Sequence, residues 1–354
     1  MIRNVERHDT EWLKKIAAYM RERQIGIESD PRWLGVLHGA LGHQTLALVS
    51  VEGNDAGNGG RVNGYLPVAL VKSALFGRFL VSLPYVNRAG LHADDEGVEQ
   101  ALIERGCELA ERHNVQYLEL RHTAEQAGSW TQISEQRNEK VIMELGLAGD
   151  EPGLWKQVGA KVRNLVRKGR KNGLEVQWGG VELLESFYDI FAVNMRDLGT
   201  PVYPRKLFES VLRAFGGEAE LCAVKHAGRA VAAALVLHDQ VAGKTFIPSA
   251  SCLRDANRLS ANMWMYYQLL KRAMERGSEV FDFGRTTVGS GTHKFKKQWG
   301  ATEVGCVWQY HVLRGKIGGM RPDNPSMQRR IELWKKMPVW ATRVIGPSIV
   351  KGIP

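Results

Sequence analysis

The stretch from Asp282 to Ala301 concentrates residue types suited to chemistry on an anionic substrate. An apolar strand that contains Asp282 and Arg285 runs into a segment with Gly289 and Gly291. Glycines allow tight turns and close approach of the backbone to a ligand, and lysines beside backbone N–H groups form an anion site. We therefore expect a glycine-rich loop that binds an anion. Its basic and aromatic side chains are His293, Lys294, Phe295, Lys296, Lys297 and Trp299.

The same stretch has a simpler interpretation. It is also compatible with a basic surface hairpin whose aromatic side chains fold into the core. If the segment is extended, neighbouring side chains point to opposite faces, so Lys296 should face the anion and Lys297 should point away from it.

A second basic cluster lies on a predicted helix from Lys161 to Lys171. No acidic residue occurs between Lys156 and Lys171, and Arg163 and Arg167 share a face with Lys171 at i, i+4, i+8 spacing. Like charges at this spacing repel by a few tenths of a kcal/mol per pair. This cost favours an anionic ligand, although a solvated helix face is the alternative. We expect Arg163 or Arg167 to share one anion pocket with Lys296.

The elements that must position these residues occur twice in the same order. The order strand, strand, strand, helix, strand fits residues 45–122 and again residues 219–286. Alignment of the two last strands places Arg121 opposite Arg285. The expected fold is α/β, with mixed sheets and flanking helices in two tandem domains, although chance similarity of two α/β segments is the alternative. No GxGxxG follows the first strand, which argues against a dinucleotide-binding fold.

The predicted helices and turns follow local patterns. Apolar residues recur at helical spacing in residues 97–115 and 260–278. The Asn/Gly-rich run from Gly53 to Gly60 predicts a hairpin turn or flexible loop. We place the domain boundaries at 1–150 and 151–313, followed by a basic, Trp-containing tail at 314–354.

Composition limits the classes of protein that fit. The chain has 354 residues, a formal net charge of +10 and 44% hydrophobic residues. Excess positive charge favours anionic partners. The four cysteines form no CxxC pair, which argues against a zinc or thioredoxin-like motif, and we predict no metal site. The N-terminus lacks the apolar segment of a secretory signal, and no window approaches the ~20 apolar residues of a spanning helix, so we expect a cytoplasmic protein.

The tail mixes Trp334 and Trp340 with aliphatic and basic residues, and Pro338 divides it into two short segments. Basic residues beside Trp are typical of segments that lie in a membrane interface. The tail would then hold the protein at the inner membrane face by contact with anionic lipid. The alternative, a tail that packs on the protein's own surface, is equally open.

Three motifs give the chain a family resemblance over roughly Ser29 to Leu313. They are RFLVSLPYVNRAGL at Arg78–Leu91, KVRNLVRKGRKNGLEV at Lys161–Val176, and DFGR with GTHKFKKQWGA at Asp282–Ala301. The chain resembles the FemAB family of aminoacyl transferases, built from tandem acetyltransferase-like (GNAT) domains. More narrowly, it is similar to the FemAB-related proteins associated with exosortase/PEP-CTERM and exopolysaccharide loci.

The resemblance implies an enzyme that moves an acyl or aminoacyl group onto an amine of a cell-envelope or exopolysaccharide precursor. The implied donor is aminoacyl-tRNA, with no bound cofactor. GNAT relatives take acyl groups from acyl-CoA instead, through a Gln/Arg-x-x-Gly-x-Gly/Ala loop, but Ala261 and Met263 stand at the glycine positions here. A third hypothesis, of another class, is a non-catalytic binding module for RNA or an anionic glycan precursor.

The resemblance also suggests site residues. Phe295 and Lys296 match the family's Phe-Lys-Lys motif, whose lysine helps to hold the phosphates of a nucleotide-linked sugar, and Arg163 and Arg167 fall in its basic helix. Transfer to an amine needs a proton acceptor and stabilisation of an oxyanion. Candidate catalytic residues are Asp282, Arg285 and His293, with structural roles as the alternative for each. The remaining candidate substrate-binding residues are Lys294, Trp299, Tyr85 and Asn87.

Overall fold

The computed structural model describes residues 1–53, 60–317 and 325–354, which form two compact units. Unit 1 comprises Met1–Lys140, Gly305–Arg321 and Lys351–Pro354, and unit 2 comprises Val141–Val304 and Pro322–Val350. The units are therefore not consecutive segments like the expected 1–150, 151–313 and 314–354, because the chain returns to each unit after leaving it. Most of the Asn/Gly-rich run Gly53–Gly60 lies outside the described residues.

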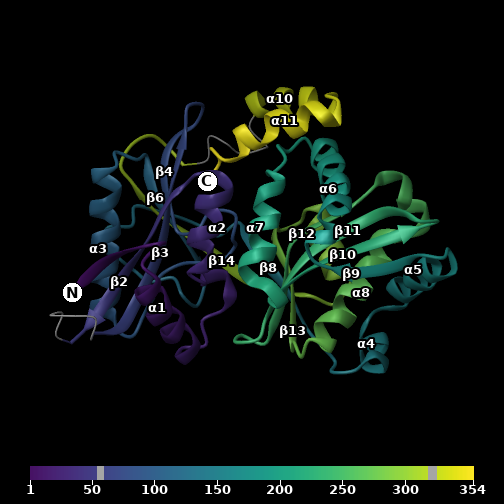
Figure 1. Ribbon diagram of the computed structural model, residues 1–354, viewed down its shortest axis with the longest axis horizontal. Helices are drawn as coiled ribbons and strands as arrows, with labels where there is room; N and C mark the ends of the chain where they lie inside the picture. The colour runs from purple at the N-terminus through teal and green to yellow at the C-terminus, as the bar shows by residue number, and fades with distance from the viewer. Residues whose placement is uncertain (54–59, 318–324) are drawn as a thin grey trace. The chain divides into compact units, whose positions relative to one another are not determined.

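Unit 1 is a mixed sheet with the strand order β1-β2-β3-β4-β6-β14, to which β5 adds beside β3 and β7 beside β14. Helix α3 packs on one face of this sheet, and α1 and α2 cover the other (Figure 1). Its elements are β1 (Ile2–Glu6), α1 (Thr10–Glu22), η1 (Ile27–Ser29), α2 (Arg32–Leu41), β2 (Gln44–Glu52), β3 (Arg61–Ser73), β4 (Gly77–Val81), β5 (His92–Ala93), α3 (Glu96–Arg112), β6 (Tyr117–Thr123), β7 (Glu135–Arg137) and most of β14 (Thr302–Val312).

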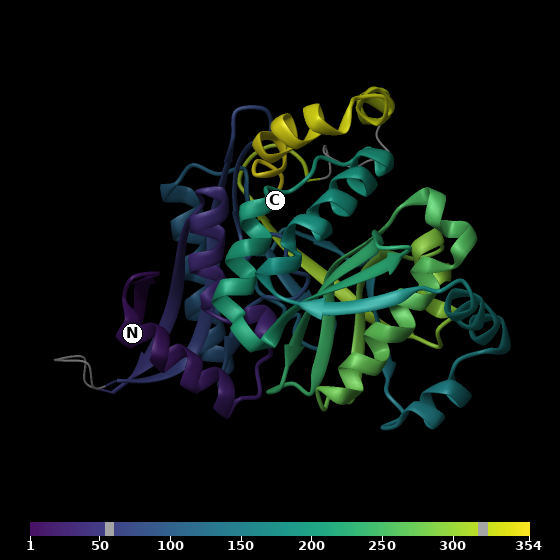
Figure 2. The same ribbon diagram turned by 45° about the vertical axis from the view of Figure 1, so that its right-hand side comes forward.

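Unit 2 has the strand order β8-β13-β12-β11-β10-β9. Helices α6 and α7 lie on one side of this sheet and α8 on the other (Figure 2). Its elements are β8 (Lys140–Gly146), α4 (Glu151–Gln157), α5 (Ala160–Lys171), β9 (Glu175–Gly179), η2 (Val181–Leu183), α6 (Leu184–Leu198), α7 (Arg205–Phe215), η3 (Gly216–Glu218), β10 (Ala219–His226), β11 (Arg229–Asp239), β12 (Lys244–Cys252), η4 (Arg254–Leu259), α8 (Ala261–Glu275), β13 (Val280–Thr287), α9 (Gly291–Lys297), α10 (Pro325–Lys335) and α11 (Val339–Val350).

The predicted repeat is confirmed by element order and by strand direction. In unit 1, β2 to β3 and β3 to β4 pair antiparallel, and β6 pairs parallel to β4. In unit 2, β10 to β11 and β11 to β12 pair antiparallel, and β13 pairs parallel to β12. Arg121 and Arg285 therefore lie on corresponding strands. The repeat also extends further upstream than the sequence indicated, since a strand and two helices precede each set.

Local signals explain where two of the helices begin and end. The side chain of Asp95 accepts a hydrogen bond from the Val98 N–H and begins α3. Gly173, with a φ of 69°, follows the end of α5, where a glycine in the left-handed conformation commonly ends a helix. Val162 and Val166 of α5 are buried, so this helix has an apolar face as well as its basic one.

The tail is not a free extension. Helices α10 and α11 belong to unit 2 and pack against α6 (Figures 1 and 2). Among the described residues, no helix has both the length and the apolar character needed to cross a membrane.

Candidate functional site

The neighbouring strands β12 and β13 of unit 2 separate part of the way along their length. Their parallel pairing consists of Lys244 with Val280, Thr245 with Phe281, and Phe246 with Asp282. Beyond these pairs β12 runs on to Cys252 and β13 to Thr287, while β11 stays paired with β12 up to Cys252. Strands that diverge in this way present backbone N–H and C=O groups with which an extended ligand can pair.

The residues after β13 form a short helix, so the expected extended, glycine-rich loop is wrong. The Ser290 side chain caps α9 by accepting a hydrogen bond from the His293 N–H at 3.2 Å. Gly289, with a φ of 79°, makes the turn into this cap. The cap satisfies an N–H group that the first turn of a helix otherwise leaves unpaired, and it turns the basic run into a helix.

Lys296 is buried at the point where the strands separate, with only 7% of its surface exposed. Its ammonium donates hydrogen bonds to the carbonyl oxygens of Gly284 at 2.8 Å and Arg285 at 3.1 Å. Burial lowers the pKa of Lys296 to about 8, the charge of Asp282 opposes this shift, and the charge of Arg285 adds to it. These two carbonyls use two of the three N–H groups of an ammonium.

Asp282 is also buried beside this lysine. Its Oδ1 accepts a hydrogen bond from the Gly284 N–H at 2.6 Å. Gly284 has a φ of 76°, a left-handed conformation that favours glycine. The structure thus brings together three of the expected residues, Asp282, Arg285 and Lys296, around a glycine that sequence reasoning did not single out.

His293 and Lys297 share a carboxylate that the sequence did not suggest. Glu303 Oε1 lies 3.0 Å from Lys297 Nζ and 2.8 Å from His293 Nε2. The hydrogen bond from Lys297, followed by that from His293, lowers the pKa of the Glu303 carboxyl. His293 Nδ1 accepts from the Gly289 N–H at 3.2 Å, so Nε2 carries the proton given to Glu303. Both ring nitrogens are occupied, and a role as base requires one of these bonds to break.

Lys296 and Lys297 do differ as expected, but for another reason. On the helix their side chains lie about 100° apart around the axis rather than on opposite faces of a strand. Lys296 enters the protein, whereas Lys297 is exposed and pairs with Glu303. Lys294, the third lysine of α9, is exposed.

The expected aromatic residues face the core of unit 2. Trp299 is fully buried, and Phe295 packs on it and on Tyr266. Tyr266 also stacks on Phe283 of β13. These side chains pack beneath α9 and β13. The simpler interpretation of this stretch also placed its aromatic side chains in the core.

Arg163 and Arg167 bind α4. Arg163 Nη1 donates to the carbonyl oxygens of Val158 and, at 3.2 Å, Trp155. Arg167 donates to Asn164 Oδ1 at 3.0 Å, and its guanidinium lies 5.1 Å from the centre of the Trp155 ring. The printed partners of these arginines lie on α4 and α5, whereas Lys296 binds carbonyls of β13, so the shared anion pocket stays a prediction.

The start of α8 offers a second feature near the diverging strands, because β12 leads through η4 into this helix. No side chain caps α8, and Ser260 before it has a φ of 62°. Free N–H groups and the helix dipole attract anions at such an end. Met263 stands at the second glycine position of the acyl-CoA loop. Its sulfur accepts a 3.8 Å hydrogen bond from Nε2 of Gln298, the residue that follows α9.

In unit 1, Arg121 holds a strained turn. The turn contains two non-glycine residues in the left-handed region, Leu83 with a φ of 49° and Tyr85 with a φ of 71°. Arg121 donates to the Val86 carbonyl and to Glu119, both at 2.8 Å, and is buried with Glu119. Strain of this kind persists only where surrounding contacts impose it.

Of the two substrate-binding candidates in unit 1, Tyr85 has a clear environment. Its Oη lies 3.3 Å from Nε2 of buried His43, and the two rings stack with centres 6.0 Å apart. Burial, with a smaller effect of the Lys351 charge, lowers the pKa of His43 to about 4. Asn87 is half-buried at the end of the same turn.

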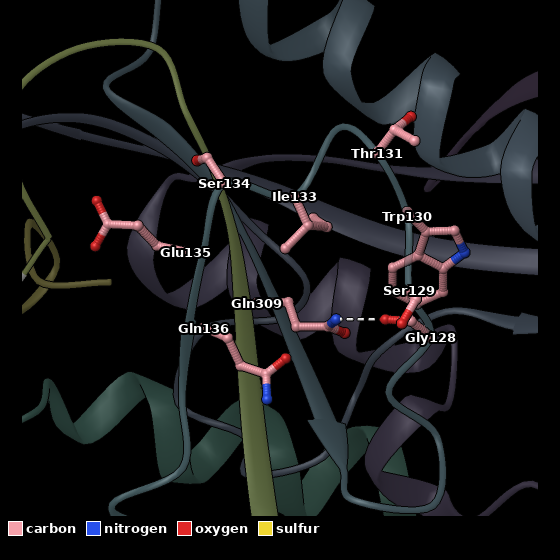
Figure 3. Close-up of a pocket in the computed structure, with 9 residues that line it drawn as sticks. All are labelled: Gly128, Ser129, Trp130, Thr131, Ile133, Ser134, Glu135, Gln136 and Gln309. Carbon is pink, nitrogen blue, oxygen red and sulfur yellow. Dashed lines mark hydrogen bonds between the residues drawn. The ribbon is translucent and has the colours of Figure 1, made fainter.

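Unit 1 contains a hollow of about 400 Å³. Figure 3 shows the residues that line it, among them Gln309 of β14, whose side-chain amide donates to the Gly128 carbonyl. Its single charged lining residue, Glu135, is negative, so the hollow does not suit a phosphate. Its lining residues are Gly128, Ser129, Trp130, Thr131, Ile133, Ser134, Glu135, Gln136 and Gln309.

Two of the cysteines, Cys222 and Cys252, are poor nucleophiles. Burial raises the pKa of Cys252 to about 11 and raises the pKa of Cys222 still further. Because the thiolate is the reactive form, neither is a good candidate for a covalent intermediate.

Residues 156–297 match the family model described as Acetyltransferase (GNAT) domain, which gives the chain an acyltransferase domain. Among curated proteins, none matches this sequence. The solved structures include FemX, with 14% identity, a TM-score of 0.59, and coverage of 95% of this chain and 100% of that one.

Two other solved structures are similar over most of this chain. L-PGS from Bacillus licheniformis has 13% identity, a TM-score of 0.56, and coverage of 97% and 98% of the two chains. A tandem GNAT protein from the clavulanic acid biosynthesis pathway has 15% identity, a TM-score of 0.55, and coverage of 89% and 100%. At these identities the similarity shows the fold: the chain has the tandem GNAT fold that its sequence predicted.

Proposed function

We propose that this protein transfers an acyl or aminoacyl group to an amine, and that the transfer takes place where β12 and β13 of unit 2 separate. The observation that carries the proposal is the buried Lys296 at that point, bound to the carbonyls of Gly284 and Arg285. A buried ammonium is costly unless it is compensated. The domain match over residues 156–297 includes both strands and this lysine.

The reaction has a simple balance. The amine nitrogen attacks the carbonyl carbon of the donor, a C–N bond forms, and the C–O bond of an ester or the C–S bond of a thioester breaks. The amine loses one proton, and the leaving oxygen or sulfur gains one. Developing negative charge on the carbonyl oxygen needs preorganised donors. In the proposal, backbone N–H groups of the separated strands and the third N–H of Lys296 provide them.

Aminoacyl-tRNA is the proposed donor, with acyl-CoA as the alternative. The uncapped start of α8 suits the phosphates of either donor. Met263 stands where the acyl-CoA loop has a glycine, and its side chain extends to Gln298, which works against close approach of a pyrophosphate to the backbone. The resemblance to the FemAB family also favours the tRNA ester.

The proposed acceptor is an amine on a phosphate-bearing precursor of the cell envelope or of an exopolysaccharide. The net charge of +10 supports an anionic substrate. The association with exosortase/PEP-CTERM systems stays a prediction of the sequence resemblance, as does a location at the inner membrane face.

The test compares two neighbouring lysines. The full chain is incubated with isotope-labelled aminoacyl-tRNA or acetyl-CoA and an amino-sugar nucleotide, and the amide product is measured by mass spectrometry. Lys296→Met should reduce transfer by about 100-fold or more, the effect of losing one oxyanion donor. Lys297→Met should leave transfer nearly unchanged. Equal effects of the two substitutions, with both variants folded by circular dichroism, would refute the assignment of this site.

A further inference from the structure

Helix α11 carries its large apolar side chains on the outside. Trp340 is 72% exposed and Val344 is 71% exposed, and they are one turn apart on the same face. Ile345 beside them is exposed as well. The inner face consists mainly of small residues, namely Ala341, Thr342 and Gly346, with Val350 at the end of the helix. A helix that only packed on its own protein would place these residues the other way round.

Contacts on the inner face fix this orientation. A Cβ on Gly346 would lie 2.8 Å from the backbone nitrogen of Val202, so no larger side chain fits there without movement. Arg343 forms an ion pair with Asp189 of α6, and its guanidinium lies 5.1 Å from the centre of the Tyr188 ring. Helix α11 therefore cannot turn its apolar face inward without losing these contacts.

The preceding helix adds positive charge and one more apolar residue. Leu333 of α10 is 68% exposed, and Arg329 and Arg330 are exposed. Between Pro325 and Val350 the sequence holds five basic residues and one acidic residue, Glu332, which pairs with Lys335 at 2.7 Å. The five basic residues are Arg329, Arg330, Lys335, Lys336 and Arg343.

We propose that exposed residues of the two helices, Arg329, Arg330 and Leu333 of α10 with Trp340 and Val344 of α11, act together as one α10–α11 face and bind the surface of an anionic phospholipid bilayer. Exposed Trp and aliphatic side chains enter the boundary between headgroups and acyl chains, and basic residues bind anionic headgroups. The charge disfavours a second copy of the chain as the occupant, because two such faces would repel each other. This surface lies on elements other than the strands of the transfer site, so the inference does not depend on the proposed reaction.

The experiment is co-sedimentation of the full chain with vesicles of equal parts phosphatidylcholine and phosphatidylglycerol, and with vesicles of phosphatidylcholine alone. Wild-type protein should bind the anionic vesicles and bind the neutral ones much less. Trp340→Ser combined with Val344→Ser should lower binding by about tenfold or more through loss of apolar insertion. Arg329→Gln combined with Arg330→Gln should also lower it by about tenfold or more, since each basic residue near the surface contributes a factor of about five.

Two controls test whether the face itself is responsible. Val181→Ser combined with Val241→Ser removes two other exposed apolar side chains of unit 2 and should leave binding unchanged. Trp340→Phe combined with Val344→Leu should retain binding. All four residues are exposed, so the thermal midpoints should agree within error.

Three outcomes would overturn the proposal. One is equal binding of anionic vesicles by wild type and by the Trp340→Ser, Val344→Ser variant. Another is the absence of vesicle binding by wild-type protein. The third is a wild-type dimer in analytical ultracentrifugation that Trp340→Ser converts to a monomer, which would assign the face to contact between copies of the chain.

Discussion

The ammonium nitrogen of Lys296 lies 2.8 Å from the carbonyl oxygen of Gly284, at the residue where β13 adopts a left-handed conformation. A non-glycine residue would be strained in this conformation, and the lysine binds the carbonyl that the distortion exposes. Asp282 binds the N–H of the same glycine. A basic and an acidic side chain thus hold the two polar groups of one peptide position, beside the place where the strands separate.

The pH dependence of transfer should follow Lys296. Because burial lowers its pKa to about 8, the ammonium is present below that value and is lost as the pH rises through it. We expect kcat/KM to fall as the pH rises through about 8. Lys296→Arg, which stays charged, should move this fall to higher pH if the larger side chain is accommodated. An increase in rate through pH 8 in the wild type would instead make Lys296 a proton acceptor.

Acyl-CoA should bind weakly. Met263 takes the place of a loop glycine, and we expect calorimetry with acetyl-CoA to give a dissociation constant above about 1 mM. Met263→Gly should bind acetyl-CoA more tightly than wild type, because glycine lets the ligand approach the backbone. Asn262→Gly, at the neighbouring position, is the matched control and should show no gain. Micromolar binding by the wild-type chain would move the proposal to the acyl-CoA alternative.

Removal of one partner of the buried ion pair Glu119–Arg121 should strongly destabilise unit 1. Loss of one charge leaves the other buried and uncompensated, so Glu119→Gln should lower the free energy of unfolding by about 3–5 kcal/mol. The double variant Glu119→Leu, Arg121→Met should cost less than the sum of the single changes. Glu22→Gln, which removes the exposed pair with Arg61, should have almost no effect. If urea denaturation shows that the change in unfolding free energy of the double variant equals the sum of the two single changes, the pair is not coupled.

Gly346 should be needed for the packing of α11. Gly346→Ala places a methyl group against the Val202 backbone, and overpacking of this kind costs about 1–3 kcal/mol. Gly39→Ala in α2 is a suitable control, because nothing lies within 4 Å of the added Cβ. It should stabilise the protein by about 0.5–1 kcal/mol through helix propensity. A thermal midpoint that rises in both variants would contradict the close packing seen at α11.

Buried neutral histidines should make the protein sensitive to mild acid. His122 Nε2 accepts from the Leu91 N–H, and burial lowers the pKa of His122 from 6.5 to about 4. Between these pH values the unfolded state binds more protons, so the free energy of unfolding should fall as the pH falls from about 6.5 to about 4. NMR should show the His122 ring still neutral near pH 5, whereas titration of this ring at its ordinary pKa would contradict the burial.

The repeat was predictable because it depends on local patterns. The helical spacing of apolar residues in α3 and α8, and the alternation of apolar and polar residues in the strands, can be recognised in short windows of sequence. The position of Lys296 was not, because a lysine normally stays solvated, and its burial depends on two carbonyls that appear only once β13 is distorted at Gly284. The contacts of Arg163 escaped prediction for a similar reason. They are made with backbone oxygens at the end of α4. Every residue type has such an oxygen, so the sequence does not identify these acceptors.

Glu303 illustrates a middle case. Glu303 follows the basic helix closely in sequence, which makes it a possible partner for Lys297. Whether the two side chains meet depends on the turn at Gly300, which the sequence alone did not define. The sequence therefore predicted which residue types the site contains, but only part of the contacts between them.

The division of the chain between the units has a consequence for synthesis on the ribosome. Strand β6 of unit 1 gains its neighbour β14 only after the whole of Val141–Val304 has been made. Until then the nascent chain exposes an unpaired strand edge, the kind of edge that recruits other strands. A ribosome that stalls within unit 2 would leave unit 1 with this edge uncovered, and such fragments should be more prone to aggregate than the finished protein.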